Sequence, residues 1–386
     1  MRILSFTTLY PSRSHPQAGI FVRSRMQAMA KQAHLVVLAP EPLFFYYNRR
    51  LQRAERSPQS YQDGDVEVIR PGWVYPPLGG PLNAICLAVT LLPIVLKLHR
   101  RFKFDLIDAH FGFPTGIAAW LLARFNKVPF TITLRGSENL HIRYRWRRVL
   151  MQHALRQAAC VIAVSERLRD LAISCGAPPE NTFCIPNGVD SQVFRLLDRA
   201  ACRAQFGFRP DVKVILTVGH LIALKGHHRV IEALNALPDV HLCIAGGAGG
   251  VKGNRSQLND LIRRHSLESR VHFLGHLGPE VLASAMCAAD VFCLASSSEG
   301  WPNVVSEALS CGTPVVATDV GAIPQMLTDQ TGIIVPPDDH VALQQALACA
   351  LGRSWNRNLI ADQGARRSWA DVGREVLDTF RRQGSF

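Results

Sequence analysis

Residues 295–324 read ASSSEGWPNVVSEALSCGTPVVATDVGAIP. Asn303 is a residue type that caps helices and Gly312 a type that ends them, so a helix is predicted between them. Apolar runs on either side, at residues 291–294 and 315–317, predict two buried strands. The stretch is therefore a βαβ unit whose loop follows the carboxyl end of the first strand, where open α/β sheets bind ligands.

Two carboxylates flank this predicted loop and helix. Glu299 lies in the loop and Glu307 about one helical turn past the predicted cap. The free N–H groups and partial positive charge of a helix N-terminus suit a phosphate, whereas carboxylates suit the hydroxyls of a sugar. From spacing alone, a loop charge and a solvated helix residue explain the pair equally well.

The stretch E-G-W-P-N-V-V-S-E resembles the E-x7-E motif of family 4 glycosyltransferases, which are retaining enzymes with the GT-B fold. The resemblance spans most of the 386 residues, because further stretches follow in the family's order. These stretches are D-L-I-D-A-H (105–110), T-L-R-G-S-E (133–138), I-A-V-S-E (162–166), I-P-N-G-V-D (185–190), V-G-H-L-I-A-L-K-G (218–226) and V-H-F-L-G (271–275).

The resemblance and the pattern of elements together predict an α/β fold with two Rossmann-like α/β/α domains. Their parallel sheets are expected to face each other across a donor and acceptor cleft, as in the GT-B fold. We place an acceptor-binding domain at residues 1–190 and a nucleotide-sugar-binding domain at residues 191–367, since the composition becomes charge-balanced after residue 190. By resemblance, a C-terminal helix within 368–386 crosses back to the first domain.

The first residues and the cysteines indicate the cellular compartment in which the protein is expected. The first residues form a short apolar strand, too short for the core of a signal peptide, so a cytoplasmic protein is expected. Ten cysteines are scattered singly without any C-x-x-C, and they are interpreted as small buried hydrophobes of a reducing compartment.

The positive charge lies in the first half of the chain. Residues 1–190 carry 24 Lys and Arg against 12 Asp and Glu, which is nearly all of the net charge of +13. Such an excess indicates an anionic partner: a membrane surface, a phosphate-bearing substrate or nucleic acid. A peripheral position at the inner face of the cytoplasmic membrane, with a glycan or lipid-linked acceptor and no nucleic acid, is the expectation.

Three segments of the first half could contact a membrane. Aromatic residues at 44–47 precede four arginines between 49 and 56. The apolar run 85–98 is expected to be too short to span a bilayer and is interpreted as a core helix, although its basic tail would also suit a membrane surface. Residues 141–149 alternate arginine with aromatics, which fits either a solvated helix face or a membrane patch.

Candidate residues of the first half stand at strand ends. Gly19 follows the first strand, and by resemblance its loop faces the donor phosphates. His110 ends another strand, and the resemblance places such a histidine beside the transferred sugar; the family often has a second histidine where this chain has Asp108. Arg135, Gly136, Ser137 and Glu138 follow a third strand and are assigned to the acceptor side.

Candidate donor-binding residues lie in the second half. By resemblance, Lys225 is the diphosphate cation, Glu299 contacts the sugar, and Glu307 binds the ribose hydroxyls. Pro302 has no N–H to donate, so the phosphate is expected at the N–H groups near Asn303 and Val304. The full predicted donor set is Gly19, Gly219, His220, Lys225, Leu274, Glu299, Gly300, Trp301, Pro302, Asn303, Val304 and Glu307, with His110, Glu299 and Lys225 as the catalytic candidates.

No metal or resident cofactor is predicted, because the sequence has no D-x-D, and the nucleotide sugar is itself the donor substrate. No carboxylate pair is placed for double displacement. The expected chemistry is a front-face transfer in which the leaving phosphate takes the acceptor's proton. Bacterial cell-surface polysaccharide synthesis is the expected setting.

Two other classes stay open from the sequence. The chain could be a non-enzymatic GT-B scaffold that docks on membranes, or a GT-B epimerase or phosphorylase. The presence of Lys225, Glu299 and Glu307 argues against a decayed donor site.

His220 generates the first testable prediction, since the family usually has arginine there. Either His220 has turned away, or it faces the diphosphate and takes up a proton on binding; Gly219 and Lys225 keep the family's spacing and favour the second. Donor affinity should then increase as the pH falls from about 8 to about 6. His220→Arg should bind more tightly at pH 8 and lose most of this slope in calorimetry. Parallel curves would mean that His220 does not touch the phosphate.

Overall fold

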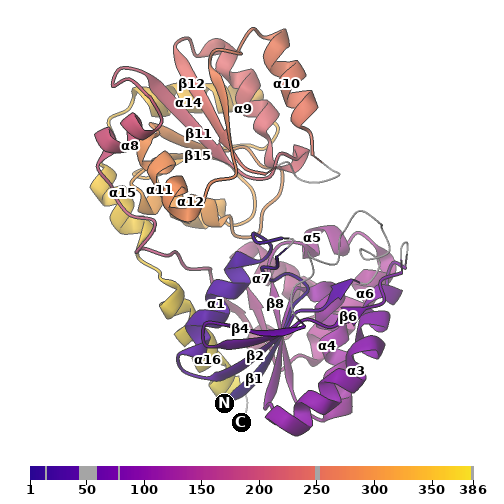
Figure 1. The fold of residues 1–386 in the computed structure, drawn as a ribbon. Helices are drawn as coiled ribbons and strands as arrows, with labels where there is room; N and C mark the ends of the chain where they lie inside the picture. Colours follow the sequence, from indigo (N-terminus) through magenta and orange to yellow (C-terminus); the bar gives the residue numbers. More distant parts are fainter. Residues whose placement is uncertain (14, 43–58, 77–78, 248–252, 384–386) are drawn as a thin grey trace. The chain divides into compact units, whose positions relative to one another are not determined.

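The computed structural model describes residues 1–13, 15–42, 59–76, 79–247 and 253–383. The chain forms two compact units: Met1–Asn187 with Trp369–Phe386, and Gly188–Ser368 (Figure 1). The boundary between the two units lies between Asn187 and Gly188, three residues before the predicted boundary at 190/191. The C-terminal segment belongs to the first unit.

The first unit contains an eight-stranded sheet in the order β10-β9-β8-β7-β1-β2-β5-β4. All neighbouring strands are parallel except β4 and β5. Its strands are β1 (Arg2–Phe6), β2 (His34–Leu38), β4 (Ser60–Asp63), β5 (Val66–Ile69), β7 (Leu106–His110), β8 (Phe130–Leu134), β9 (Cys160–Ala163) and β10 (Thr182–Cys184), and a separate parallel pair is formed by β3 (Glu41–Pro42) and β6 (Gly72–Trp73).

Helices cover both faces of this sheet because its strands are apolar on both sides. Alternate residues of β1 show this: Leu4 and Phe6 belong to one core cluster and Ile3 to the other. α3, α4 and α6 pack on the first face, and α1 and α16 on the second. The helices are α1 (Ile20–Ala30), α3 (Leu82–Phe102), α4 (Ile117–Asn126), α5 (Glu138–His141), α6 (Arg145–Gln157), α7 (Glu166–Ser174) and α16 (Trp369–Gln383).

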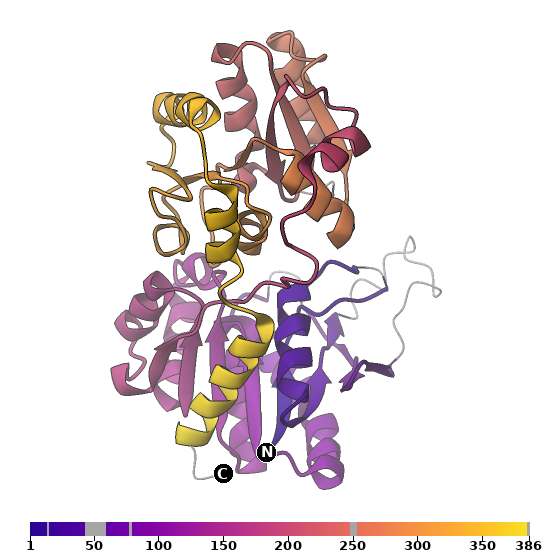
Figure 2. The same cartoon turned by 90° about the vertical axis from the view of Figure 1, so that its left-hand side faces the viewer.

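The C-terminal helix α16 completes the core of the first unit. Figure 2 shows it, in yellow, beside α1. A Cβ added to Gly373 would lie 3.0 Å from the Cβ of Ala28 in α1, so the two helices approach closely. Phe380 is 1% exposed and packs with Val22 and Met26. The last segment of the chain is therefore needed to cover the α1 side of the sheet.

The prediction that the apolar run 85–98 is too short to span a bilayer is wrong, because the helix that contains it extends beyond the run at both ends. The helix α3 has 21 residues, because Pro93 lies inside it without ending it and the basic tail continues it to Phe102. By length and composition α3 could cross a membrane. One face of α3 is nonetheless buried in the core, with Leu87, Leu91 and Val95 fully covered.

The second unit contains a six-stranded parallel sheet in the order β13-β12-β11-β14-β15-β16. This is the strand order of a doubly wound fold, in which the direction of winding reverses between β11 and β14. The strands are β11 (Lys213–Val218), β12 (Val240–Ala245), β13 (Val271–Gly275), β14 (Val291–Leu294), β15 (Val315–Thr318) and β16 (Gly332–Val335).

Two helical layers enclose this second sheet. α9, α10 and α14 bury one face, and α8, α11, α12 and α15 bury the other. The helices are α8 (Arg199–Gln205), α9 (His227–Ala233), α10 (Arg255–Arg264), α11 (Pro279–Ala288), α12 (Asn303–Ser310), α13 (Ile323–Met326), α14 (His340–Gly352) and α15 (Arg357–Gly364).

The predicted fold class is confirmed: both units are α/β, the second sheet is parallel and the first is parallel except for β4, and helices cover both faces of each. The aromatic and arginine residues between 44 and 56 lie outside the described residues. Seven of the ten cysteines are buried.

The covering role of α16 yields a stability prediction. Phe380→Ala should lower the free energy of unfolding of the first unit by about 3–5 kcal/mol, because it leaves a cavity between α16 and α1. The matched control is Phe125→Ala, whose ring is 65% exposed and should change stability by less than about 0.5 kcal/mol. Urea unfolding of the full chain measures both. Similar losses from the two variants would contradict a core role for α16.

Candidate functional site

The predicted donor residues gather at the winding reversal of the second unit. β11 and β14 are neighbours in the sheet, and the loops at their carboxyl ends carry Gly219–Gly226 and Ala295–Pro302. A crevice forms at such a point because the chain leaves the two strands toward opposite faces of the sheet. The structure thus brings together two motifs that are more than 70 residues apart in the sequence.

Lys225 and Glu299 meet directly. The Nζ of Lys225 donates to Oε1 of Glu299 at 2.7 Å, and the Oγ of Ser296 donates to the same oxygen at 2.7 Å. The two charged side chains are 21% and 10% exposed. A charge-assisted hydrogen bond in so sheltered a place fixes both side chains. No described residue bonds to Oε2 of Glu299, so this oxygen can accept from a ligand hydroxyl.

Two glycines allow the backbone to approach this pair. At Gly226, with φ of 68°, an added Cβ would lie 1.9 Å from the carbonyl oxygen of Ala295. At Gly321, with φ of 55°, it would lie 2.4 Å from the carbonyl oxygen of Glu299. Both positions combine the left-handed region with a contact that no side chain tolerates. The Glu299 loop is therefore held between two glycine turns.

Backbone hydrogen bonds hold the same loop from its other sides. Ser297 donates its N–H to the carbonyl of Leu224 at 3.0 Å, and Ala322 donates to the carbonyl of Gly300 at 3.1 Å. Thr318 donates its hydroxyl to the carbonyl of Ser296 at 2.6 Å. Trp301 carries a buried indole N–H that has no hydrogen-bond partner among the described residues.

The structure corrects the start of α12. Asn303 was predicted as the cap, but it is the first residue of the helix, and Pro302 occupies the cap position with an extended backbone. Proline fits there because the cap's missing N–H is not needed by the helix. Val304 follows Asn303 in the first turn. Gly312 ends this region as predicted, with φ of 70° just after the helix.

Glu307, in the body of α12, is half-buried. Burial raises the pKa of its carboxyl to about 7, since the charged form loses hydration. A carboxylate in that condition gains from any ligand that donates hydrogen bonds to it. The predicted partner, a ribose with two vicinal hydroxyls, has this chemistry.

The remaining donor candidates lie around the end of β11. A Cβ on Gly219 would lie 3.2 Å from Cδ of Lys225, so the lysine stem runs beside the glycine. His220 is exposed, and its Nδ1 lies 3.8 Å from the position of a Cβ on Gly247. Leu274 is partly buried in β13 against the core. Each of these positions follows or ends a strand, at the sheet edge that carries Lys225.

The first unit has its own winding reversal, between β1 and β7. Gly19 lies in the loop after β1 and begins α1, with φ of 70°; a Cβ there would lie 2.3 Å from the carbonyl oxygen of Leu9. His110 is the last residue of the neighbouring β7. Gly19 thus lies at the far end of the loop after β1, and His110 lies at the end of the adjacent strand β7.

His110 is fully buried, and the protein uses both of its ring nitrogens. Nε and Nη2 of Arg135 lie 3.2 and 3.0 Å from Nδ1. Arginine can only donate, so Nδ1 is unprotonated and Nε2 carries the proton. Nε2 lies 3.1 Å from Oγ of Ser5. Burial lowers the pKa of His110 to about 4, which agrees with a neutral ring.

The buried pair of Arg25 and Asp108 was not predicted from the sequence. Nη2 of Arg25 lies 3.2 Å from Oδ2 of Asp108, and Thr131 donates to Oδ1 at 3.0 Å. Burial opposes ionisation of Asp108, but Arg25, His110 and Thr131 outweigh it and hold its pKa at about 2. Arg25, on α1, thus supplies the counter-charge of the buried Asp108.

Glu138 is a structural anchor of the acceptor-side loop. Its fully buried carboxylate accepts N–H bonds from Gly112 at 2.9 Å, Arg135 at 3.1 Å and Gly136 at 2.8 Å. The Oγ of Ser137 lies 3.5 Å away from it. With its oxygens bonded in this way, Glu138 ties the loops after β7 and β8 together.

The guanidinium of Arg135 contacts Asn187 and Phe21. Nη1 donates to Oδ1 of Asn187 at 3.2 Å, and the guanidinium lies 5.1 Å from the ring centroid of Phe21. Burial, and then the charge of Arg25, lower its pKa to about 9, so Arg135 is still a cation at neutral pH. The groups that its guanidinium contacts, His110, Asn187 and Phe21, are neutral.

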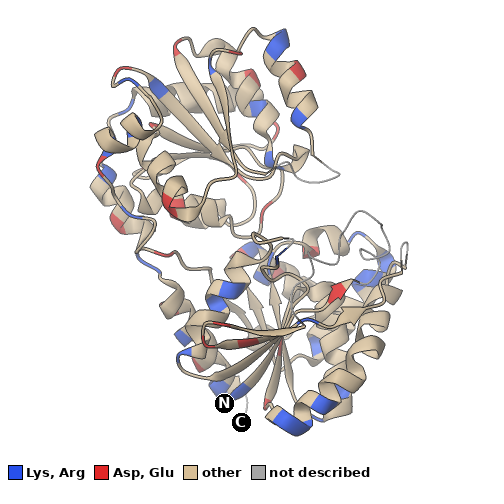
Figure 3. Ribbon diagram, viewed as in Figure 1, with Lys and Arg blue, Asp and Glu red and all other residues tan. Residues whose placement is uncertain are grey.

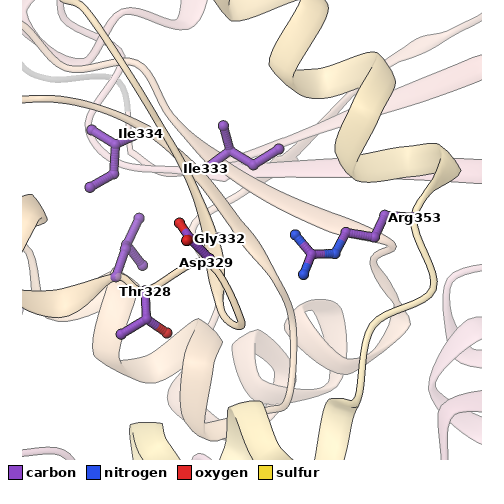
Figure 4. Close-up of a pocket in the computed structure, with 7 residues that line it drawn as sticks. Thr328, Asp329, Gly332, Ile333, Ile334 and Arg353 are labelled. Atoms are coloured by element: carbon purple, nitrogen blue, oxygen red, sulfur yellow. The ribbon is translucent and has the colours of Figure 1, made fainter.

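No group of three or more His, Cys, Asp or Glu side chains that could hold a metal ion occurs among the described residues. A cavity of about 300 Å³ lies elsewhere in the second unit, with Thr328 and Arg353 on opposite sides of it (Figure 4). None of the predicted site residues lines this cavity. Its lining is Leu327, Thr328, Asp329, Gly332, Ile333, Ile334 and Arg353.

Comparisons with known proteins cover both units. Residues 18–193 match the family model described as Glycosyltransferase Family 4, and residues 198–367 match Glycosyl transferases group 1. The Bacillus subtilis protein named teichuronic acid biosynthesis glycosyltransferase TuaC is 27% identical over 358 residues, 90% of this chain and 88% of the relative. The D-inositol 3-phosphate glycosyltransferase of Corynebacterium aurimucosum is 30% identical over 314 residues, 74% of each chain.

Solved structures share the fold. Sucrose-phosphate synthase from Thermosynechococcus elongatus aligns with a TM-score of 0.82 and 21% identity, over 99% of both chains. Anabaena HepE in complex with UDP aligns with a TM-score of 0.76 and 21% identity, over 99% of this chain and 100% of HepE. The expected GT-B fold class is therefore confirmed.

The raised pKa of Glu307 predicts a pH dependence of stability. In the window between the ordinary pKa of 4.5 and about 7, the folded state holds a proton that the unfolded state has lost, so stability falls as pH rises. Glu307→Gln removes this titration. The variant's stability relative to the wild type should therefore increase by about 1–3 kcal/mol from pH 5 to pH 8 in urea unfolding. A constant difference across this range would contradict the raised pKa.

Proposed function

The chain belongs to the glycosyltransferases of the family 4 and group 1 type, and from that premise we propose that it moves a sugar from a nucleoside diphosphate to a glycan or lipid-linked acceptor with retention of configuration. The ion pair of Lys225 and Glu299 at the winding reversal of the second sheet is the observation that carries the proposal. It places one cation and one free carboxylate oxygen at the edge where such sheets bind ligands.

The proposed donor position follows from charge. The diphosphate takes Lys225 and the first N–H groups of α12 near Asn303 and Val304, where the helix dipole adds positive potential. Pro302 has no N–H and cannot take part. Glu299 then accepts hydrogen bonds from sugar hydroxyls, and Glu307 from the ribose. HepE has been solved with UDP and with UDP-glucose, which supports a nucleotide sugar as the donor of this fold.

The proposed chemistry is a front-face substitution. The bond between the sugar's anomeric carbon and the phosphate oxygen breaks as the acceptor oxygen bonds to the same face of that carbon. The acceptor's proton passes to the departing phosphate, so the protein supplies no base. Its contribution is to hold Lys225 and Glu299 in place before the charge develops, since preorganised groups need no rearrangement in the transition state.

We assign the acceptor to the loop of Arg135, Gly136 and Ser137, where the guanidinium of Arg135 has no carboxylate partner among the described residues. Glu138 supports this loop from beneath. His110, buried and bonded to Arg135, then acts by orienting the guanidinium. The name of TuaC supports a setting in cell-surface polysaccharide synthesis.

Replacement of Glu299 tests the proposed function. Glu299→Ala should lower sugar transfer by about 10²–10³-fold, because the site loses a preorganised partner of the sugar. The fold should persist, since residue 299 lies in a loop outside the regular elements. Glu268→Ala, an exposed glutamate of the same unit, is the matched control and should keep full activity.

The donor for this assay comes from a thermal-stabilisation screen of UDP-, GDP- and ADP-sugars with the wild type, because a bound ligand raises the unfolding temperature. Product analysis must show the sugar on an acceptor or in water, which separates transfer from epimerisation and phosphorolysis. Wild-type turnover in folded Glu299→Ala protein would remove this residue from the site.

A further inference from the structure

The start of α6 breaks a local rule of helix design. Its first turn contains Arg145, Arg147 and Arg148 and no acidic residue. The N-terminal end of a helix carries partial positive charge, so cations there destabilise it. Arg143 precedes them in the same turn of chain. Departures of this kind that are not compensated locally indicate a functional surface.

These four arginines have no counter-ions within the part of the chain that the structure describes: neither Arg143, Arg145, Arg147 nor Arg148 forms an ion pair there. Two of them contact aromatic rings: the guanidinium of Arg147 lies 4.8 Å from the ring centroid of Phe113 and 4.5 Å from that of Tyr144, and the guanidinium of Arg145 lies 5.6 Å from that of Trp146. Figure 3 shows the blue start of α6. An anionic partner outside the chain would remove the mutual repulsion of these charges.

Large apolar side chains stand among the arginines. Leu140 is 54% exposed, Tyr144 53%, Trp146 64% and Val149 43%. These residues fall within ten positions, and a soluble surface seldom exposes so many large apolar groups together. We call residues 140–149 the α5–α6 surface.

A second apolar stripe lies in the same helical layer. Leu82, Ile85 and Val89 of α3 are 58%, 39% and 67% exposed, at a spacing that puts them on one side of the helix. α3, α4 and α6 all pack on the same face of the sheet, the one that carries Leu4 and Phe6 of β1 (Figure 1). The apolar exposure of this layer is therefore not confined to α6.

A bilayer fits these features better than nucleic acid does. Nucleic acid would satisfy the arginines, but it offers no apolar region for Leu140 and Val149. A membrane interface has anionic headgroups beside acyl chains, and tryptophan and tyrosine concentrate at that depth. Arginine stems bury along the same boundary while their guanidinium groups reach the phosphates.

We propose that the α5–α6 surface docks the protein on an anionic lipid bilayer. Trp146, Tyr144 and Val149 enter the headgroup region, and Arg143, Arg145 and Arg148 bind lipid phosphates. The docking needs no donor and no residue of the second unit, so it stands or falls separately from the sugar-transfer proposal.

Vesicle sedimentation of the full chain tests this surface. The wild type should sediment with vesicles containing phosphatidylglycerol but not with pure phosphatidylcholine, and raising the salt from about 0.05 to 0.5 M should release it. Arg143→Gln with Arg145→Gln and Arg148→Gln should weaken binding on the order of 100-fold, at about five-fold for each arginine. Trp146→Ser with Val149→Ser should weaken it about ten-fold.

The matched control is Arg124→Gln with Phe125→Ser on α4, which removes an exposed arginine and an exposed aromatic of the same unit and should leave binding unchanged. Stabilisation by nucleotide sugars should be equal in all variants, which shows intact donor sites. Equal sedimentation with both vesicle types, no sedimentation, or equal losses in the control and the arginine variant would overturn the proposal. Displacement from the vesicles by duplex DNA at matched phosphate concentration would favour nucleic acid instead.

Discussion

The second unit of this protein depends on one hydrogen-bonded ion pair, that of Lys225 and Glu299. The two residues belong to motifs far apart in the chain, and they meet because β11 and β14 are adjacent where the winding of the sheet reverses. Glycine turns at Gly226 and Gly321 let the backbones approach closely enough for the pair to form. A sheltered pair that lost one partner would leave a desolvated charge, so the loops on both sides are constrained together.

In the first unit the corresponding constraint is that each buried carboxylate needs a counter-ion or hydrogen-bond donors. Asp108 is paired with Arg25, and Glu138 accepts three backbone N–H bonds. His110 is held neutral because the donors of Arg135 face its Nδ1. Among the described residues no carboxylate pairs with the guanidinium of Arg135, in contrast to that of Arg25, and this supports the proposed acceptor side. The charge of Asp108 is thus balanced by Arg25 of the neighbouring helix α1.

Much of this could be predicted from the sequence. Apolar runs that end in glycine-rich or polar loops indicate parallel strands, and motif order indicated the fold class. What the sequence could not supply was the partner of each charge. Nothing local to Arg25 marks it as the counter-ion of Asp108, since 83 residues separate them. Asn303 has the composition of a cap, yet the proline before it takes that position. The length of α3 was underestimated because Pro93, which is exposed, lies inside the helix without ending it.

The central claim is that Lys225 binds the diphosphate while Glu299 binds the sugar, and a calorimetric cycle tests it most directly. Wild type, Lys225→Ala, Glu299→Ala and the double variant are titrated with the nucleoside diphosphate that stabilises the protein most and with its sugar derivative. The account predicts that Lys225→Ala weakens both ligands by about ten-fold or more. Glu299→Ala should weaken the sugar derivative and leave the nucleoside diphosphate within about two-fold. Unchanged affinity for the nucleoside diphosphate in Lys225→Ala would contradict the account.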